Sequence, residues 1–101
     1  MLNKKITIVN PSGIDLKFAG EICKASMDYK SKILLLTENS EINVKSILNL
    51  LGANIAHNQE VELLCEGNDE EQAFSVISSM LEGVYDAREW DKKRGTLLFD
   101  L

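Results

Sequence analysis

The sequence predicts an α+β fold in which helices cover one face of a four-stranded antiparallel sheet, an open-faced β-sandwich. Short apolar alternations typical of strands are interleaved with stretches of helical spacing, in the order β-α-β-β-α-β-α. Two of the strands are separated by only a three-residue turn, so we expect them to pair as a hairpin. The 101 residues are 45% hydrophobic, which suits a single globular domain.

The first strand and the first helix are expected near the N-terminus. Residues 6–9 alternate so that Ile6 and Ile8 share one face of a strand. A Pro-Ser-Gly turn then leads into a helix that begins near Asp15 and ends near Asp28. Its apolar stripe has the three- and four-residue spacing of an amphipathic helix. The stripe consists of Ala19, Ile22, Cys23 and Ser26.

The middle of the chain is expected to form a hairpin followed by a short helix. Residues 33–37 are a continuous apolar run typical of a buried strand, residues 38–40 form a turn, and residues 41–44 form a short returning strand. Ser46 is a preferred N-cap residue, and it precedes a short helix that runs through Leu51 and ends at a Gly-Ala-Asn sequence.

The last strand and the last helix follow. Residues 61–66 alternate between apolar and polar side chains, as a half-buried strand does. Residues 67–69 form a turn and a helix cap, and residues 70–81 form the longest helix, with Glu70 and Glu71 placed to complement its dipole. The core face of this helix consists of Ala73, Phe74, Ile77, Met80 and Leu81.

The charge of the chain excludes several kinds of partner. The formal net charge of −5 argues against non-specific nucleic-acid binding and against binding to anionic membranes. No apolar run approaches the ~20 residues of a membrane span, and the N-terminus lacks the apolar block of a signal peptide. We therefore expect a cytosolic protein.

The sequence predicts neither a metal site nor a cofactor. Cys23 and Cys65 lie far apart in the sequence, and with His57 they supply too few ligands for zinc. Both cysteines fall on apolar faces, so we expect buried free thiols. His57 falls in a polar turn and is expected to be exposed.

Three segments carry a resemblance to a known protein family. Residues 13–19 read Gly-Ile-Asp-Leu-Lys-Phe-Ala. This resembles Gly-Ile-His-Ala-Arg-Pro-Ala, the active-site loop of the HPr family, the phosphocarrier proteins of the sugar phosphotransferase system. Residues 43–48 resemble its regulatory-serine segment, and residues 66–73 resemble its turn into the last helix. The segments fall at the family's spacing, so the resemblance covers roughly residues 4–81. We expect an HPr-like domain at 1–83 and a C-terminal extension at 84–101.

The resemblance implies that the family's phosphotransfer site is degenerate here. Asp15 takes the position of the phosphorylated histidine, and Lys17 takes that of the arginine. A carboxylate cannot form the family's phosphohistidine, and lysine lacks the bidentate fork of arginine. We therefore expect Asp15 to be a helix N-cap in a protein that is not an enzyme. The alternative hypothesis is a phosphocarrier that uses an acyl phosphate on Asp15.

The resemblance also implies a regulatory serine and a surface for protein partners. Ser46 matches the serine that an ATP-dependent kinase phosphorylates in the family. Helical spacing favours Ile47, Leu50 and Leu51 as the inward stripe of the short helix and leaves Leu48 exposed. The family docks partners through its first two helices, and the corresponding residues are Leu16, Gly20, Lys24, Met27, Ile47, Leu48 and Leu51. The leading hypothesis is a non-catalytic regulatory or adaptor protein.

The tail from residue 84 matches no family motif. It contains Trp90, the basic residues 92–94 and the apolar run 96–99. The tail is interpreted as a packed extension, such as an edge strand or flap, or as a docking arm for another chain. A third hypothesis follows from the docking arm, namely a structural module that forms a homodimer through the tail.

Overall fold

The computed structural model describes residues 1–83, in which the expected elements follow one another in the predicted order. The strands are β1 Leu2–Thr7, β2 Lys32–Leu36, β3 Glu41–Asn43 and β4 Glu60–Glu66. The helices are α1 Leu16–Ser26, α2 Ile47–Gly52 and α3 Glu70–Leu81. The predictions for Trp90, for residues 92–94 and 96–99, and for a tail-mediated dimer fall outside the described residues.

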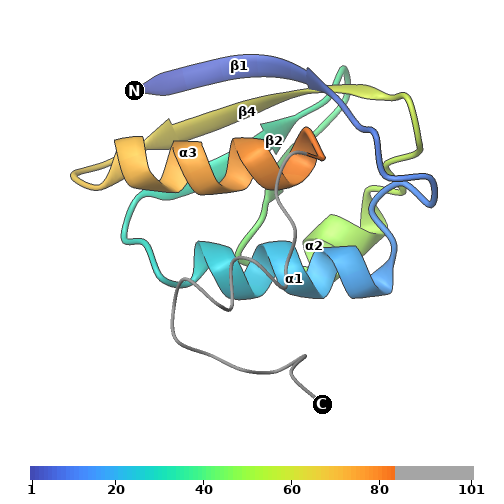
Figure 1. Cartoon of the computed structure of the whole chain (residues 1–101), viewed down its shortest axis with the longest axis horizontal. Helices are drawn as coiled ribbons and strands as arrows, with labels where there is room; N and C mark the ends of the chain where they lie inside the picture. Colours follow the sequence, from blue (N-terminus) through green and yellow to red (C-terminus); the bar gives the residue numbers. More distant parts are fainter. Residues whose placement is uncertain (84–101) are drawn as a thin grey trace.

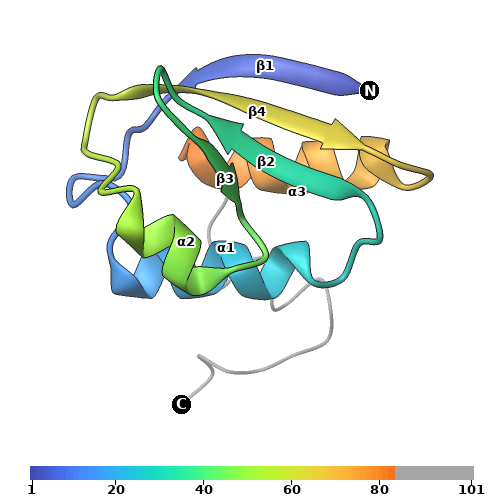
Figure 2. The same ribbon diagram turned by 180° about the vertical axis from the view of Figure 1, so that it is seen from behind.

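The strands form one antiparallel sheet in the order β1-β4-β2-β3. In Figure 1 the sheet lies above α1 and α3. Figure 2, which shows the molecule from behind, places α2 beside α1 on the same side of the sheet. The three helices therefore cover one face of the sheet, which confirms the predicted open-faced α+β sandwich.

The hydrophobic core lies between the sheet and the helices. Val61, Leu63 and Cys65 alternate along β4 and are all buried, as strand periodicity predicts. On the neighbouring strand β2, Ile33 lies opposite Cys65 and Leu35 lies opposite Leu63, and both are buried as well. Burial raises the pKa of the Cys65 thiol to about 11, so this sulfur packs as an apolar group and is not a nucleophile.

The first strand does not lie where the hydrophobic alternation predicted it. β1 begins at Leu2 and ends at Thr7, because pairing with β4 starts opposite Cys65 and not at the apolar run. Ile8 is fully buried as predicted, but it lies beyond the regular ladder and pairs with the loop before β4. Its N–H donates to the carbonyl of Gln59 at 2.9 Å. β1 is an edge strand, where polar side chains are tolerated, and its sequence therefore lacks a clear apolar signal.

The predicted core face of α1 contains one error, and that of α3 is confirmed. On α1 the fully buried positions include Ala25, whereas Cys23 is only half-buried. The Cys23 thiol turns towards the segment before α2 and donates to the carbonyl of Lys45 at 3.3 Å. On α3, Phe74 is half-buried, whereas the other four predicted core residues are buried. Phe74 still packs against the hydrophobic core, so it lies on the predicted face.

Candidate functional site

The start of α1 is fixed by a tight loop. The Asn10 side-chain amide donates to the Gly13 carbonyl at 2.6 Å, and the Gly13 N–H donates to the Asn10 carbonyl at 2.8 Å. Gly13 has a φ of +65°, and a Cβ at this position would lie 2.3 Å from the Ile55 carbonyl oxygen. The Ile14 N–H donates to the same oxygen at 2.9 Å. The loop before α1 is therefore held against the segment after α2.

Asp15 is the N-cap of α1, as predicted. One carboxylate oxygen accepts from the Phe18 N–H at 2.9 Å, and the Asp15 carbonyl accepts from the Ala19 N–H at 2.8 Å. Asp15 and Lys17 are both exposed in this first turn. The carboxylate thus supplies the negative charge that a helix N-terminus favours and uses one of its free N–H groups.

Ser46 is the N-cap of α2, which confirms its expected structural role. Its hydroxyl accepts from the Asn49 N–H at 3.2 Å, and its side chain is half-buried. The Asn49 side chain reaches back in turn and accepts from the Asn43 N–H at 2.7 Å. Residues on both sides of the cap therefore fix the start of this short helix.

The residues predicted to bind partners lie on two helices that pack against each other. A Cβ at Gly20 would be 3.8 Å from the side chain of Ile47, so these positions of α1 and α2 are neighbours. Leu16 is 67% exposed, Met27 63% and Leu48 79%, which confirms the expectation for Leu48. Lys24 is exposed and Leu50 is buried as predicted, but Ile47 and Leu51 are only half-buried. We define the docking face as Leu16, Gly20, Lys24, Met27, Ile47, Leu48 and Leu51.

A link between α1 and the segment before α2 has no counterpart among the sequence-based predictions. The Lys45 ammonium donates to the Tyr29 carbonyl at 2.6 Å, and the Lys45 carbonyl accepts from the Cys23 thiol. The contacts join residues more than fifteen positions apart, so local patterns carry no signal for them. They fix the C-terminal end of α1 relative to α2 and with it the shape of the docking face.

Asp69 plays a different role from the predicted cap. It stands at the N-cap position of α3, but its side chain makes no hydrogen bond to that helix. Its carboxylate instead accepts from the hydroxyl and N–H of Ser31 and from the N–H of Lys30, the last at 2.8 Å. These bonds, that of the Ser31 hydroxyl first, lower the pKa of Asp69 from its usual value. Asp69 therefore anchors the loop between α1 and β2 and does not belong to the candidate site.

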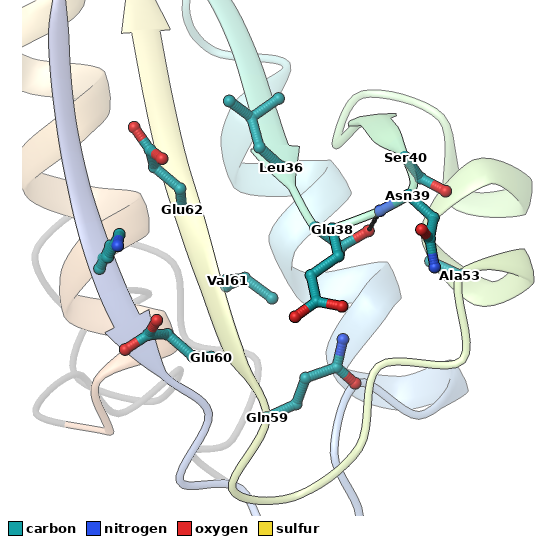
Figure 3. A pocket seen from close by; sticks show the side chains of 11 residues that line it. Leu36, Glu38, Asn39, Ser40, Ala53, Gln59, Glu60, Val61 and Glu62 are labelled. Atoms are coloured by element: carbon teal, nitrogen blue, oxygen red, sulfur yellow. Dashed lines mark hydrogen bonds between the residues drawn. The ribbon is translucent and has the colours of Figure 1, made fainter.

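A separate hollow of about 720 Å³ opens where the turn between β2 and β3 meets the start of β4 (Figure 3). Glu38, Glu60 and Glu62 line it together with Lys5 and Leu36. None of the residues of the docking face lines this hollow. Three carboxylates oppose the binding of a phosphate group, so the hollow is not a candidate site for phosphate.

Two further findings concern residues 1–83 only. No group of histidine, cysteine and acidic side chains in this range is arranged to hold a metal ion, and no helix in it is long and apolar enough to cross a membrane. His57, the single histidine of the chain, is exposed as predicted, with its Nδ1 3.2 Å from the Asn10 carbonyl oxygen.

Comparison with known proteins identifies the family. A family model described as "PTS HPr component phosphorylation site" matches residues 2–83. The chain belongs to the HPr family. The phosphocarrier protein HPr of Mycoplasma pneumoniae is 37% identical over 82 residues, which cover 78% of this chain and 93% of that protein. The HPr-like protein Crh of Halalkalibacterium halodurans is 24% identical over 82 residues, covering 81% and 98%.

Solved structures agree with this assignment. The crystal structure of HPr-C-His from Thermoanaerobacter tengcongensis matches with a TM-score of 0.78 at 26% identity, covering 82% of this chain and 93% of that chain. HPr proteins are phosphocarriers of the phosphotransferase system and not catalytic enzymes, as the sequence indicated. The family works through contacts with partner proteins, and the docking face is the candidate surface for them.

Proposed function

We propose that this HPr family member is a regulatory or adaptor protein that docks partner proteins through α1 and α2 and carries no phosphate at position 15. The observation that carries the proposal is the Asp15 carboxylate, which caps α1 through the Phe18 N–H where the resemblance implies a phosphorylated histidine. In this proposal the protein works in the cytosol, where it would meet the partners of the phosphotransferase system.

The chemistry of the capped helix start supports the loss of phosphotransfer. An imidazole nitrogen is a neutral nucleophile, whereas the Asp15 carboxylate is an anion that repels an incoming phosphoryl donor. At a separation of about 4 Å the repulsion between two unit charges is roughly 1 kcal/mol in water and about 4 kcal/mol near a protein surface. Lys17 offers a point charge in place of the fork with which arginine binds two phosphate oxygens.

The exposed side chains of the docking face support a role in binding proteins. In the described part of the chain, Leu16, Met27 and Leu48 keep most of their apolar surface exposed to water. Exposed apolar clusters mark interaction sites. Lys24 adds a positive charge on the same side of α1 as Leu16, because the two are eight residues apart. A partner that fits this face presents apolar side chains with an acidic neighbour.

Phosphorylation of Ser46 is the proposed regulation of this face. The Ser46 hydroxyl is half-buried and bonds the Asn49 N–H, so a phosphate there would replace one cap by a more highly charged one. The added charge would lie within two positions of the exposed Leu48. Because an apolar contact weakens beside an uncompensated charge, the modification would change partner binding.

Intact mass spectrometry tests the proposal directly. We expect no mass gain with phosphoenolpyruvate and enzyme I under conditions that phosphorylate a histidine-containing HPr, which serves as the positive control. We expect the mass of one phosphate to be added with ATP and the serine kinase, and none in Ser46→Ala. A stoichiometric phosphate that enzyme I adds and hydroxylamine removes would establish the alternative, an acyl phosphate on Asp15.

The proposal also divides the chain into an HPr-like domain at residues 1–83 and an extension at 84–101. The match of the family model to residues 2–83 and a core built within the described residues support this division. The hypothesis that the tail forms a homodimer is tested by size-exclusion chromatography of the full chain and of a chain ending at Gly83. A larger apparent mass for the full chain alone would support a structural, oligomerising role.

A further inference from the structure

The exposed apolar side chains of residues 1–83 are unevenly distributed. The large ones are Met1, Val9, Leu16, Met27 and Leu48. Three of these five belong to the docking face, whereas the apolar residues on the open face of the sheet, Leu34, Leu36 and Leu64, are buried or half-buried. The outer side of α1 and α2 is therefore the surface of this domain whose burial by another segment would be most favourable.

The described chain ends at the same end of the helical layer as the start of α1. Gly83 lies against Val9, because a Cβ at Gly83 would be 2.5 Å from a methyl carbon of that residue. Figures 1 and 2 both show the C-terminal end of α3 at the same end of the helical layer as the N-terminal end of α1, which begins at Leu16. A chain that leaves Gly83 thus starts next to one exposed apolar residue, Val9, at the end of the helical layer where α1 begins with the next one, Leu16.

Residues 84–91, which follow Gly83, have a length and a composition that suit binding to this surface. Residues 84–91 read Val-Tyr-Asp-Ala-Arg-Glu-Trp-Asp, with two aromatic residues and, from three acidic and one basic residue, a net charge of −2. Trp90 can reach about 23 Å from Gly83, whereas the 11 residues of α1 span about 16 Å. The acidic residues match the positive charge of Lys24, which lies on α1 between Leu16 at its start and Met27 just after its end.

We propose that residues 84–91 fold back along α1 and cover the docking face of the same molecule, with Trp90 packed on its apolar side chains. A tethered segment meets its site at an effective concentration in the millimolar range, so even a weak contact is largely formed. Given the proposed function, a partner must displace this segment before it can dock. The contact itself does not depend on that function.

Fluorescence of the full chain tests the contact, because Trp90 is its only tryptophan. We expect emission at a shorter wavelength, and several-fold weaker quenching by acrylamide, than in the chain unfolded by guanidinium. Leu16→Ser/Leu48→Ser removes two exposed side chains and should leave the fold intact, which circular dichroism checks. In this variant the wavelength and the quenching should move to the values of the unfolded chain.

Leu64→Ser is the matched control, because Leu64 lies on the opposite, open face of the sheet. It should leave Trp90 emission unchanged. The proposal is overturned if Trp90 is already solvent-like in the full chain, if it does not respond to the double substitution, or if it responds to Leu64→Ser instead. A shift that disappears on dilution would also overturn it, since the tail would then bind a second copy. Failure here leaves the phosphorylation tests of the proposed function unaffected.

Discussion

Gly13→Ala should be among the most destabilising small substitutions in this protein. The φ of +65° at Gly13 is a left-handed conformation that costs a non-glycine residue about 1–2 kcal/mol. The new Cβ would also lie 2.3 Å from the Ile55 carbonyl oxygen and 2.9 Å from the Cα of Ala56, both backbone atoms. Forcing a carbon into such a contact costs about 1–3 kcal/mol more. The free energy of unfolding should therefore fall by about 2–5 kcal/mol.

Urea unfolding measures this loss. With a slope of roughly 2 kcal/mol per molar, the midpoint should fall by about 1–2.5 M while the slope stays the same. Gly52→Ala is the matched control, because Gly52 ends α2 without a positive φ, and the new methyl group would meet no atom within 4 Å other than those of its chain neighbours and its own helix backbone. It should be neutral or stabilise by up to ~1 kcal/mol. If Gly13→Ala changes the free energy by less than about 0.5 kcal/mol, the close approach to Ile55 is not what fixes the start of α1.

Three further predictions concern side chains that fix the helices and the loop after α1. Asp15→Ala should destabilise by about 1 kcal/mol and Asp15→Asn by much less, because asparagine also caps helices; thermal unfolding separates them. Ser46→Ala should likewise lower the free energy of unfolding by about 1 kcal/mol, whereas aspartate in Ser46→Asp also caps helices and should keep the stability. Equal melting temperatures for the two variants would contradict a capping role for Ser46. The pKa of Asp69 is lowered in the folded state, so its contribution to stability is complete above its unfolded pKa and is lost on acidification below about pH 4. Asp69→Asn should therefore be less stable at neutral pH and lose less stability between pH 5 and 2 in chemical unfolding.

The sequence predicted features that depend on local pattern and missed those that depend on tertiary contacts. The caps at Asp15 and Ser46 were predictable because an N-cap bonds an N–H only three residues away. Asp69 follows the same local rule in sequence, yet its carboxylate bonds Lys30 and Ser31, nearly forty positions earlier. A competing partner brought close by the fold outweighed the local cap there.

The same distinction explains the candidate site. The alternation of residues 61–66 predicted the core face of β4 from the sequence alone, because burial on one face imposes a period of two. The exposure of Leu48 followed from helical spacing in the same way. The Lys45 contacts with Tyr29 and Cys23 join α1 to the segment before α2, and no periodicity encodes such a pair. The exposure of Leu48 could therefore be predicted from the sequence, but the contacts that hold α1 and α2 in place could not.

Asp15 connects the stability of this domain to its proposed loss of phosphotransfer. In a helix whose first N–H groups are free, an external anion can bind there and stabilise the helix start. Here the carboxylate of the chain itself bonds the Phe18 N–H, so the helix start is stabilised without any ligand. A phosphate group at this helix end would find the Phe18 N–H already bonded, and the negative charge of the Asp15 carboxylate would repel it. In the proposed function, the residue that stabilises α1 thus also opposes phosphate transfer at position 15, while Leu16 of α1 and Leu48 of α2 stay exposed.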